Sequence, residues 1–346
     1  MKSLLRRIDV KKTLTRFGEL SIIKSHPYMQ GRHQGFGISP RMQELMVYAG
    51  HIECYDKCNE VLERFLSINV SSAQVYRVTN SVSLSLEEEE TKAERLLEPI
   101  EKSDVLYVEL DGSMVSTRED GWKEVKLARL FKGRDCLNPN STSSYLSHSQ
   151  YVALFGNSDA FGGKLQQTLS EYGELKERLV FITDGATWIK EWIADHYPHA
   201  TAILDYYHAC EHLHQFADTA FKDKTQKELW CRKQKELILE SGLDEALINI
   251  EQTTAKEEEK AKLLNYYRNN RHRMDYKRYR TVGCGIIGSG AIESAHRTVI
   301  QKRMKLSGQH WSKQGVKNML RLRIFSMNRQ WGKIIETIKY PLKHAA

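Results

Sequence analysis

The stretch DVLYVELDG (Asp104–Gly112) decides the fold, because an apolar, β-rich run that ends in Asp-Gly predicts a buried strand followed by a turn. Two runs of the same kind come later, RLVFITDG (Arg178–Gly185) and HATAILDYY (His199–Tyr207). Between them and the first run, WKEVKLARLF (Trp122–Phe131) and SQYVALF (Ser149–Phe155) predict two more strands. Strands that first follow one another and then alternate with helices indicate an α/β fold with a sheet of mixed direction.

The rest of the chain predicts mostly helices around this sheet. Five parts are expected: an N-terminal arm with a possible hairpin (1–40), a helical DNA-binding domain with an acidic linker helix (41–100), a catalytic core in two pieces (101–214 and 276–310), an all-helical insertion (215–275) and basic C-terminal helices (311–346). Thr13–Ile23, with its β-branched residues and Gly, is the candidate hairpin. The helices from Trp311 to Trp331 are expected to cover the sheet.

The helical domain predicts three short helices over 41–49, 53–68 and 71–83. Ser71 or Ser72 is the candidate N-cap of the third helix, because apolar residues precede it. Three short helices with Ser and Arg on the last are compatible with a helix-turn-helix DNA reader. A plain helical bundle explains the pattern equally well.

The net charge is unevenly distributed along the 346 residues. The chain has 52 Lys+Arg, 44 Asp+Glu and a net charge of +8. Lys262–Ala346 holds 19 basic and 3 acidic residues, a balance of +16, which leaves −8 for the remainder. A basic end on an acidic body favours a polyanionic partner, most often nucleic acid, over simple solvation. Charge alone does not separate DNA from RNA or anionic lipid.

Composition also excludes several classes of protein. No apolar run approaches the roughly 18–20 residues of a membrane helix, so no membrane partner is expected. The start, MKSLLRRIDVKK, has charges on both sides of a short apolar patch and no cleavage site, which is unlike a secretory signal. Six scattered cysteines do not resemble a disulfide framework, so we expect a cytoplasmic protein.

Three carboxylates are candidates for catalysis. Asp111 and Asp184 each follow an apolar run at the expected rim of the sheet, and Glu293 lies about one turn into a helix that Ser289 or Gly290 would start. Three carboxylates from separate elements can hold two Mg²⁺ ions about 4 Å apart, which suits phosphodiester chemistry. Either Asp-Gly alone is more often an ordinary turn. The pair together with Glu293, beside a basic region, favours a metal site.

Four blocks of the chain resemble bacterial insertion-sequence transposases of the DDE, RNase H-like class, closest to the Kra group, which are relatives of Mutator-type elements. The blocks are VELDGSMV (108–115), FITDGATWIKEW (181–192), ILDYYHACEHL (203–213) and GSGAIESAHRTVIQKRMKLSGQHWS (288–312). The resemblance implies an RNase H-like core with a helical insertion. It implies strand cleavage at element ends and strand transfer to target DNA, with two Mg²⁺ or Mn²⁺ ions held by Asp111, Asp184 and Glu293. It places Asp205 and His208 in support of that site.

The expected partner is double-stranded DNA, meaning the terminal inverted repeats and the target, bound by a homo-oligomer. Residues 293, 297, 300 and 304 share a helix face, so Arg297 could approach Glu293 or a phosphate. The further basic residues expected to contact DNA are Lys302, Arg303, Lys305, Lys313, Lys317, Arg321 and Arg323. The chain departs from the family in its short N-terminus, which has no cysteine pair upstream of the helical region.

Alternatives remain open at this stage. A non-catalytic or truncated transposase-derived DNA-binding protein is compatible with the short N-terminus. His208, Glu211 and His212 form an H-x-x-E-H pattern, the inverted zinc-peptidase motif, which is a minor alternative because short patterns arise by chance among 13 His. Trp188 and Trp192 are expected in the core, with base stacking as the lesser alternative.

Overall fold

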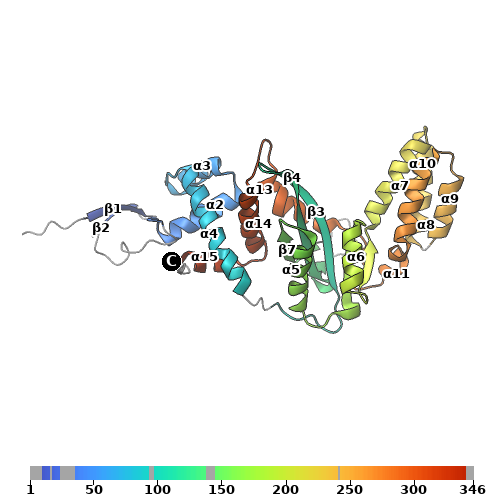
Figure 1. Ribbon diagram of the computed structural model, residues 1–346, viewed down its shortest axis with the longest axis horizontal. Helices are drawn as coiled ribbons and strands as arrows, with labels where there is room; N and C mark the ends of the chain where they lie inside the picture. Colours follow the sequence, from blue (N-terminus) through green and yellow to red (C-terminus); the bar gives the residue numbers. More distant parts are fainter. Residues whose placement is uncertain are drawn as a thin grey trace, which may run out of the picture. The chain divides into compact units, whose positions relative to one another are not determined.

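The computed structural model describes residues 10–15, 18–23, 36–92, 97–137, 145–240 and 242–339. The chain divides into two compact units (Figure 1). The first comprises Met1–Ala93 and Lys302–Ala346, and the second comprises Glu94–Gln301. The part of the basic C-terminal region that begins at Lys302 therefore folds with the N-terminal part of the chain. None of the described helices is both long and apolar enough to span a membrane.

The first unit begins with a hairpin and three helices. Strands β1 (Val10–Thr15) and β2 (Gly18–Ile23) pair antiparallel, which confirms a hairpin in the N-terminal arm. Helices α2 (Pro40–Ile52), α3 (Tyr55–Leu66) and α4 (Ser72–Lys92) follow. The Ser39 hydroxyl caps α2 by accepting from the Met42 N–H at 3.3 Å. The acidic run at 87–90 continues α4, so the prediction of a separate acidic helix is wrong.

The C-terminal helices complete the core of this unit. They are the short α13 (Lys302–Met304), α14 (Lys313–Met327) and α15 (Trp331–Lys339). Apolar residues of α14 and α15 join those of α2, α3 and α4 in one buried cluster, including Leu322, Phe325, Ile334 and Ile338. The prediction that residues 311–331 cover the sheet is therefore wrong, because their apolar side chains are used inside the helical unit.

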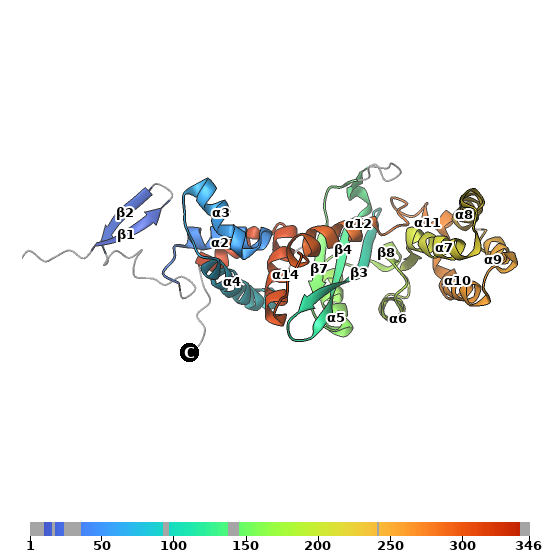
Figure 2. The ribbon, with the colours of Figure 1, turned by 90° about the horizontal axis from the view of Figure 1, so that it is seen from above.

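The second unit is built on a five-stranded mixed sheet in the order β7-β4-β3-β8-β9 (Figure 2). The strands are β3 (Leu106–Thr117), β4 (Gly121–Lys132), β7 (Gln150–Leu154), β8 (Leu179–Thr183) and β9 (Thr201–Leu204). Strand β4 pairs antiparallel with both β3 and β7, whereas β3, β8 and β9 are mutually parallel. A short pair, β5 (Cys136–Leu137) with β6 (Tyr145–Leu146), follows β4. The predicted mixed α/β sheet is confirmed.

Two hydrophobic clusters occupy the two faces of this sheet. One face packs on α5 (Ser158–Ser170) and α6 (Thr187–His196), through residues such as Phe161, Phe181 and Ile193. Trp192 packs edge-on to Phe181 at 6.1 Å in this cluster, so the core interpretation of Trp188 and Trp192 holds.

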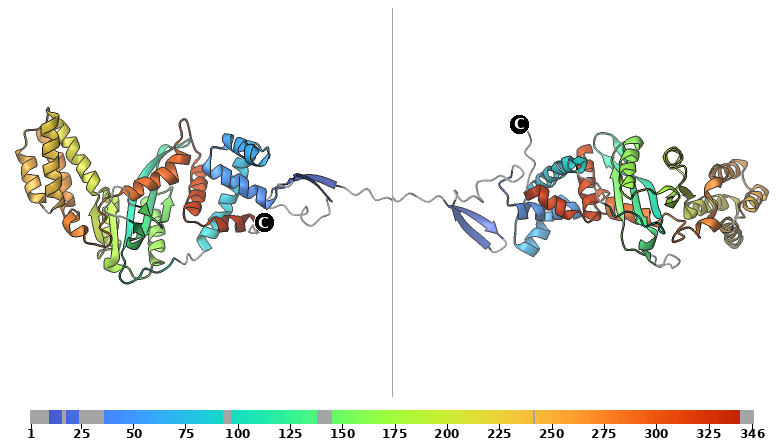
Figure 3. Two further views of the ribbon diagram at one scale, coloured as in Figure 1. Left: turned by 180° about the vertical axis from the view of Figure 1, so that it is seen from behind. Right: turned by 90° about the horizontal axis from the view of Figure 1, so that it is seen from below.

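The other face packs on helices, as the alternation of side chains along each strand requires. The helices are α7 (Tyr206–Ala220), α8 (Lys224–Leu239), α9 (Leu243–Gln252), α10 (Glu257–Asn270) and α11 (Tyr276–Tyr279). A wholly helical segment was predicted for 215–275. The observed helical segment starts earlier, at Tyr206, because it includes all of α7. On the same face, α12 (Gly290–Ala295) and the π-helical turn η4 (His296–Gln301) cross the sheet (Figure 3).

Candidate active site

Three aspartates form one row across neighbouring parallel strands. Where β3, β8 and β9 pair with one another, the last paired residues are Leu110, Thr183 and Leu204. The next residue of each chain segment is an aspartate: Asp111, Asp184 and Asp205. The Asp205 N–H donates to the Thr183 carbonyl at 2.9 Å, so the ladder extends into this row. Because adjacent strands lie about 4.8 Å apart, the register places the three aspartates next to one another along one edge of the parallel strands.

The two Asp-Gly pairs differ in their backbone setting. Asp184 directly follows β8, as predicted, and its Oδ1 accepts from the Ala186 N–H at 3.1 Å. Asp111, in contrast, lies in the middle of β3, which continues to Thr117 before turning into β4. The expectation that a strand ends at Asp111 is therefore wrong, because Gly112 pairs in the ladder rather than making a turn. The side chain of Asp111 is 38% exposed.

Asp111 has a histidine neighbour that the sequence did not single out. Nε2 of His296 lies 3.1 Å from Oδ2 of Asp111, within ion-pairing distance when the imidazole is protonated. His296 is buried on η4, three residues after Glu293. The helical spacing places Glu293 one turn before His296 on the same flank. Glu293 is itself exposed, in the first turn of α12 as predicted.

A second buried carboxylate, Glu109, fixes α12 to the sheet. Glu109 lies two residues before Asp111, on the same face of β3, and its Oε2 accepts from the Ile292 N–H at 2.7 Å. Arg129 of β4 lies opposite Glu109 of β3 in the strand ladder, and its Nη1 donates to the Ala291 carbonyl at 2.9 Å. Burial raises the pKa of Glu109 to about 8, against the opposing effect of the Ile292 N–H and Arg129. These contacts hold the helix that carries Glu293.

The carboxylate of Asp205 is fully engaged by the backbone and by a hydroxyl. Oδ1 accepts from the Tyr207 N–H at 2.8 Å, which caps α7, and Oδ2 accepts from the Ser289 hydroxyl. Asp205 is buried, so it anchors the loop that leads into α12. Asp205 thus links the aspartate row to the loop before α12.

His208 lies on the same helix, α7, but in a different setting. Its Nδ1 is 3.3 Å from Glu211 Oε2, and its ring is perpendicular to that of His212 at 4.9 Å. The ring of Tyr266, on α10, lies 4.1 Å from that of His212, and its hydroxyl donates to the Asp184 carbonyl at 3.1 Å. The helical segment thus contacts the aspartate row through Tyr266.

No group of three or more His, Cys, Asp and Glu side chains converges on a metal position within the described residues. This applies to the H-x-x-E-H residues and to Asp111, Asp184 and Glu293 alike. The donor set of the latter three, carboxylate oxygens only, is nevertheless the kind that Mg²⁺ and Mn²⁺ prefer. Two of its members share the row, and the third lies on the helix bonded to the same face.

The basic residues predicted to contact DNA divide into two groups. Lys302, Lys305, Lys313 and Lys317 are exposed, as is Arg297 on η4. Arg303, in contrast, is fully buried between the rings of Tyr55 and Trp311, at 4.9 and 5.0 Å, and its Nε donates to the Gly50 carbonyl at 3.0 Å. The prediction that Arg303 contacts DNA is therefore wrong.

Two arginines of α14 are also used inside the first unit. Arg323 is buried and donates to the His51 carbonyl at 2.9 Å. Arg321 has a side chain only 9% exposed and pairs with Glu87 at 2.8 Å. The prediction that both contact DNA is wrong, because their guanidinium groups satisfy backbone carbonyls and a carboxylate of the neighbouring helices.

Residues 31–337 match the uncharacterised protein family UPF0236, and the chain therefore belongs to this family. Among its relatives are UPF0236 proteins of Caldanaerobacter subterraneus subsp. tengcongensis. One is 25% identical over 254 residues, and a second is 26% identical over 260 residues; each alignment covers 70% of this chain and 52% of the relative. The chain thus spans about half the length of the curated relatives it matches.

Proposed function

We propose that this protein is a DNA transposase of the DDE class, which cuts phosphodiester bonds at element ends and transfers the freed strand to target DNA. The observation that carries the proposal is the in-register row of Asp111, Asp184 and Asp205, with α12 bonded to the same face. Ordinary turns do not explain aspartates at three successive strand positions, because Asp111 lies within a strand and makes no turn.

The topology supports an RNase H-like core. The antiparallel strands β3, β4 and β7 come first in the chain, and β8 and β9, which run parallel to β3, follow. The helical segment α7–α11 lies between β9 and α12 in the chain. This order is compatible with the core that the motifs predict. In the first unit, α3 and α4 are compatible with the helix-turn-helix that would bind the element ends.

Within this proposal, Asp111, Asp184 and Glu293 would hold two divalent ions. Such ions supply activation of a water or 3′-hydroxyl and stabilise charge on the leaving oxygen. The protein contributes position: β3 and β8 fix the two aspartates, and Glu109 and Arg129 fix the helix of Glu293. Asp205 fixes the loop before that helix through Ser289. Precise placement of reacting groups is the main catalytic resource in phosphoryl transfer.

The test is strand cleavage of DNA that carries the ends of the element, with Mg²⁺, by the wild type and two variants. Asp184→Asn should abolish cleavage and leave DNA binding largely intact. Asp195→Asn is the matched control, because Asp195 is exposed near the end of α6, away from the row. If Asp184→Asn cuts as fast as the wild type, the proposal fails. If the wild type binds the ends and never cuts, the chain is a non-catalytic DNA-binding protein.

A further inference from the structure

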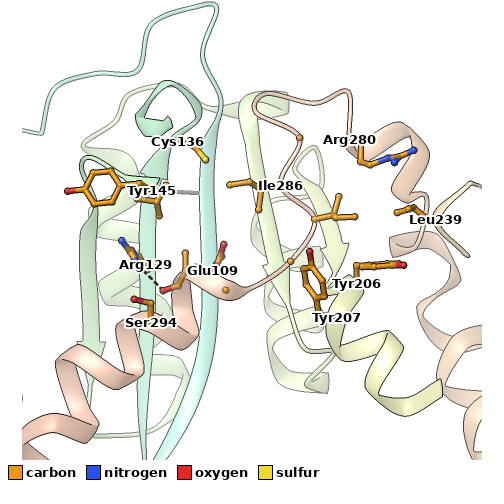
Figure 4. Close-up of a pocket in the computed structure, with 16 residues that line it drawn as sticks. Glu109, Arg129, Cys136, Tyr145, Tyr206, Tyr207, Leu239, Arg280, Ile286 and Ser294 are labelled. Carbon is orange, nitrogen blue, oxygen red and sulfur yellow. Dashed lines mark hydrogen bonds between the residues drawn. The ribbon is translucent and has the colours of Figure 1, made fainter. Parts of the chain in front are cut away.

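A cavity of about 640 Å³ opens in the second unit beside the aspartate row. Its walls come from β3 and β4, the start of α7, residue Arg280 and the glycine-rich loop 285–288 (Figure 4). The polar residues Glu109 and Arg129 lie on one side and the aromatic residues Tyr206 and Tyr207 on the other. This volume is within the range of small-molecule sites. None of the catalytic positions proposed above uses it.

One wall of the cavity is an open aromatic face. Tyr207 is 64% exposed, although it lies in the first turn of α7. A Cβ added at Gly288 would lie 2.4 Å from ring atoms of Tyr207, so the loop packs directly against the ring. Tyr206 contacts it edge-on at 5.5 Å. The ring is therefore fixed from the side of the loop and remains available for stacking from the solvent.

The opposite wall offers hydrogen bonds. Glu109 is fully buried, and its Oε1 has no hydrogen-bond partner among the residues that the structure describes. Buried polar atoms are nearly always partnered, so an unpartnered one in a residue that lines a cavity points to a ligand group. Arg129 lies beside it, whereas Arg280, which pairs with Glu240, lies across the cavity on the side of Tyr206 (Figure 4).

We propose that this cavity binds an unpaired nucleobase of the DNA strand, stacked on Tyr207 with its polar edge toward Glu109 and Arg129. A nucleobase combines the two required properties, a flat apolar face and an edge of donors and acceptors. The inference rests on the proposed function, because it takes the DNA as given and assigns the place of one base.

The position of the cavity identifies which base would enter it. Tyr207 follows Asp205 by two residues, and its N–H donates to Asp205 Oδ1, so the aromatic wall adjoins the aspartate row. A nucleotide next to the phosphate at the row could reach the cavity once its base leaves the stack. Extruding a base costs a few kcal/mol in a duplex and least at a frayed or single-stranded position. The site therefore favours DNA that is unpaired next to the cut.

The test is DNA binding measured by fluorescence anisotropy in EDTA, where no cutting occurs, at one fixed salt concentration. The probes are a short duplex with a single-stranded adenine overhang and the same duplex whose overhang is abasic. The wild type should bind the abasic probe roughly 5- to 150-fold more weakly, the range for one stacked base. Tyr207→Ala should bind both probes equally, and Tyr207→Phe should keep the difference. Trp122→Ala, an exposed aromatic that does not line the cavity, is the control and should also keep it.

Each outcome decides the proposal. Equal binding of both probes by the wild type overturns it, and so does a Tyr207→Ala variant that still prefers the adenine overhang. Both results leave the proposed transposase function standing, since cleavage by the wild type and its loss in Asp184→Asn are measured separately. Failure to bind either probe or the element-end DNA overturns both ideas.

Discussion

His51 is expected to make the first unit sensitive to acid. It is 2% exposed at the end of α2, with Nδ1 2.6 Å from the Tyr48 carbonyl and Nε2 3.2 Å from the Ser326 hydroxyl. This pairing fits a neutral ring that donates from Nδ1 and accepts at Nε2. Burial, reinforced by the charges of Arg323 and Arg303 and opposed by the Tyr48 carbonyl, lowers the pKa of His51 to about 4.

The sign and size of the effect follow from linkage. The folded-state pKa, about 4, is below the value of 6.5 for the unfolded chain. The unfolded state therefore binds more protons between these values, and the free energy of unfolding falls as the pH decreases through that window. A slope approaching 1.4 kcal/mol per pH unit gives a total loss of about 3 kcal/mol between pH 6.5 and 4. Above pH 7 the stability contributed by His51 is fully present.

The measurement is urea denaturation at several pH values between 7.5 and 4.5. Tryptophan fluorescence is a suitable signal, because the Trp331 ring lies 4.8 Å from that of His51. His51→Gln removes the titrating group, so the wild type should lose stability relative to this variant as the pH falls. His199→Gln, at an exposed histidine, is the control and should track the wild type. A constant difference between wild type and His51→Gln across the range would refute the reasoning.

Three further predictions concern Glu109, which bonds α12 to the sheet, and the basic residues Arg303 and Lys305. Glu109→Ala leaves the buried Ile292 N–H unpaired, which should cost about 1–3 kcal/mol in the stability of the second unit and slow DNA cleavage. Glu109→Gln keeps an acceptor and should retain most of the stability and most of the cleavage rate. Equal cleavage by the wild type and both variants would contradict the anchoring role. Arg303→Ala should destabilise the first unit by about 2 kcal/mol in thermal denaturation, because it removes a desolvated cation–π contact with two rings. Lys305→Ala should leave stability unchanged and reduce the salt dependence of DNA binding by about one phosphate contact, and a large loss of stability there would contradict its exposed position.

The sheet was predictable from sequence because its strands are apolar runs of the right length bounded by polar residues. The position of Asp184 after a strand was predictable, since a buried run of five residues ends just before it. Asp111 shows its limit: an Asp-Gly pair is compatible with a turn or with an extended strand, and only the pairing of β3 with β4 decides between them. The signal for Glu109 was present as an acid within VELDG, but its partner Ile292 lies 183 residues away.

The predicted DNA contacts of Arg303, Arg321 and Arg323 failed for a different reason. Arginine residues look alike in a sequence whether the guanidinium faces solvent or packs on rings. Arg303 stacks on Tyr55, a contact between segments about 250 residues apart that no local pattern reveals. The excess of basic residues near the C-terminus therefore overstated the number of exposed cations. Burial distinguishes the structural arginines from the exposed lysines, which are flexible point charges suited to phosphate.

The division between buried arginines and exposed lysines also bears on how DNA would approach the aspartate row. Carboxylates in a row repel a phosphate backbone unless their charge is neutralised. Within the second unit the exposed cation nearest in sequence to Glu293 is Arg297, on the turn that also carries His296 against Asp111. The residues that follow, Lys302 and Lys305, are exposed but belong to the first unit. A phosphate bound at Arg297 would therefore reach the row only when cations compensate the carboxylates, so DNA cleavage, more than DNA binding, should depend on the divalent metal.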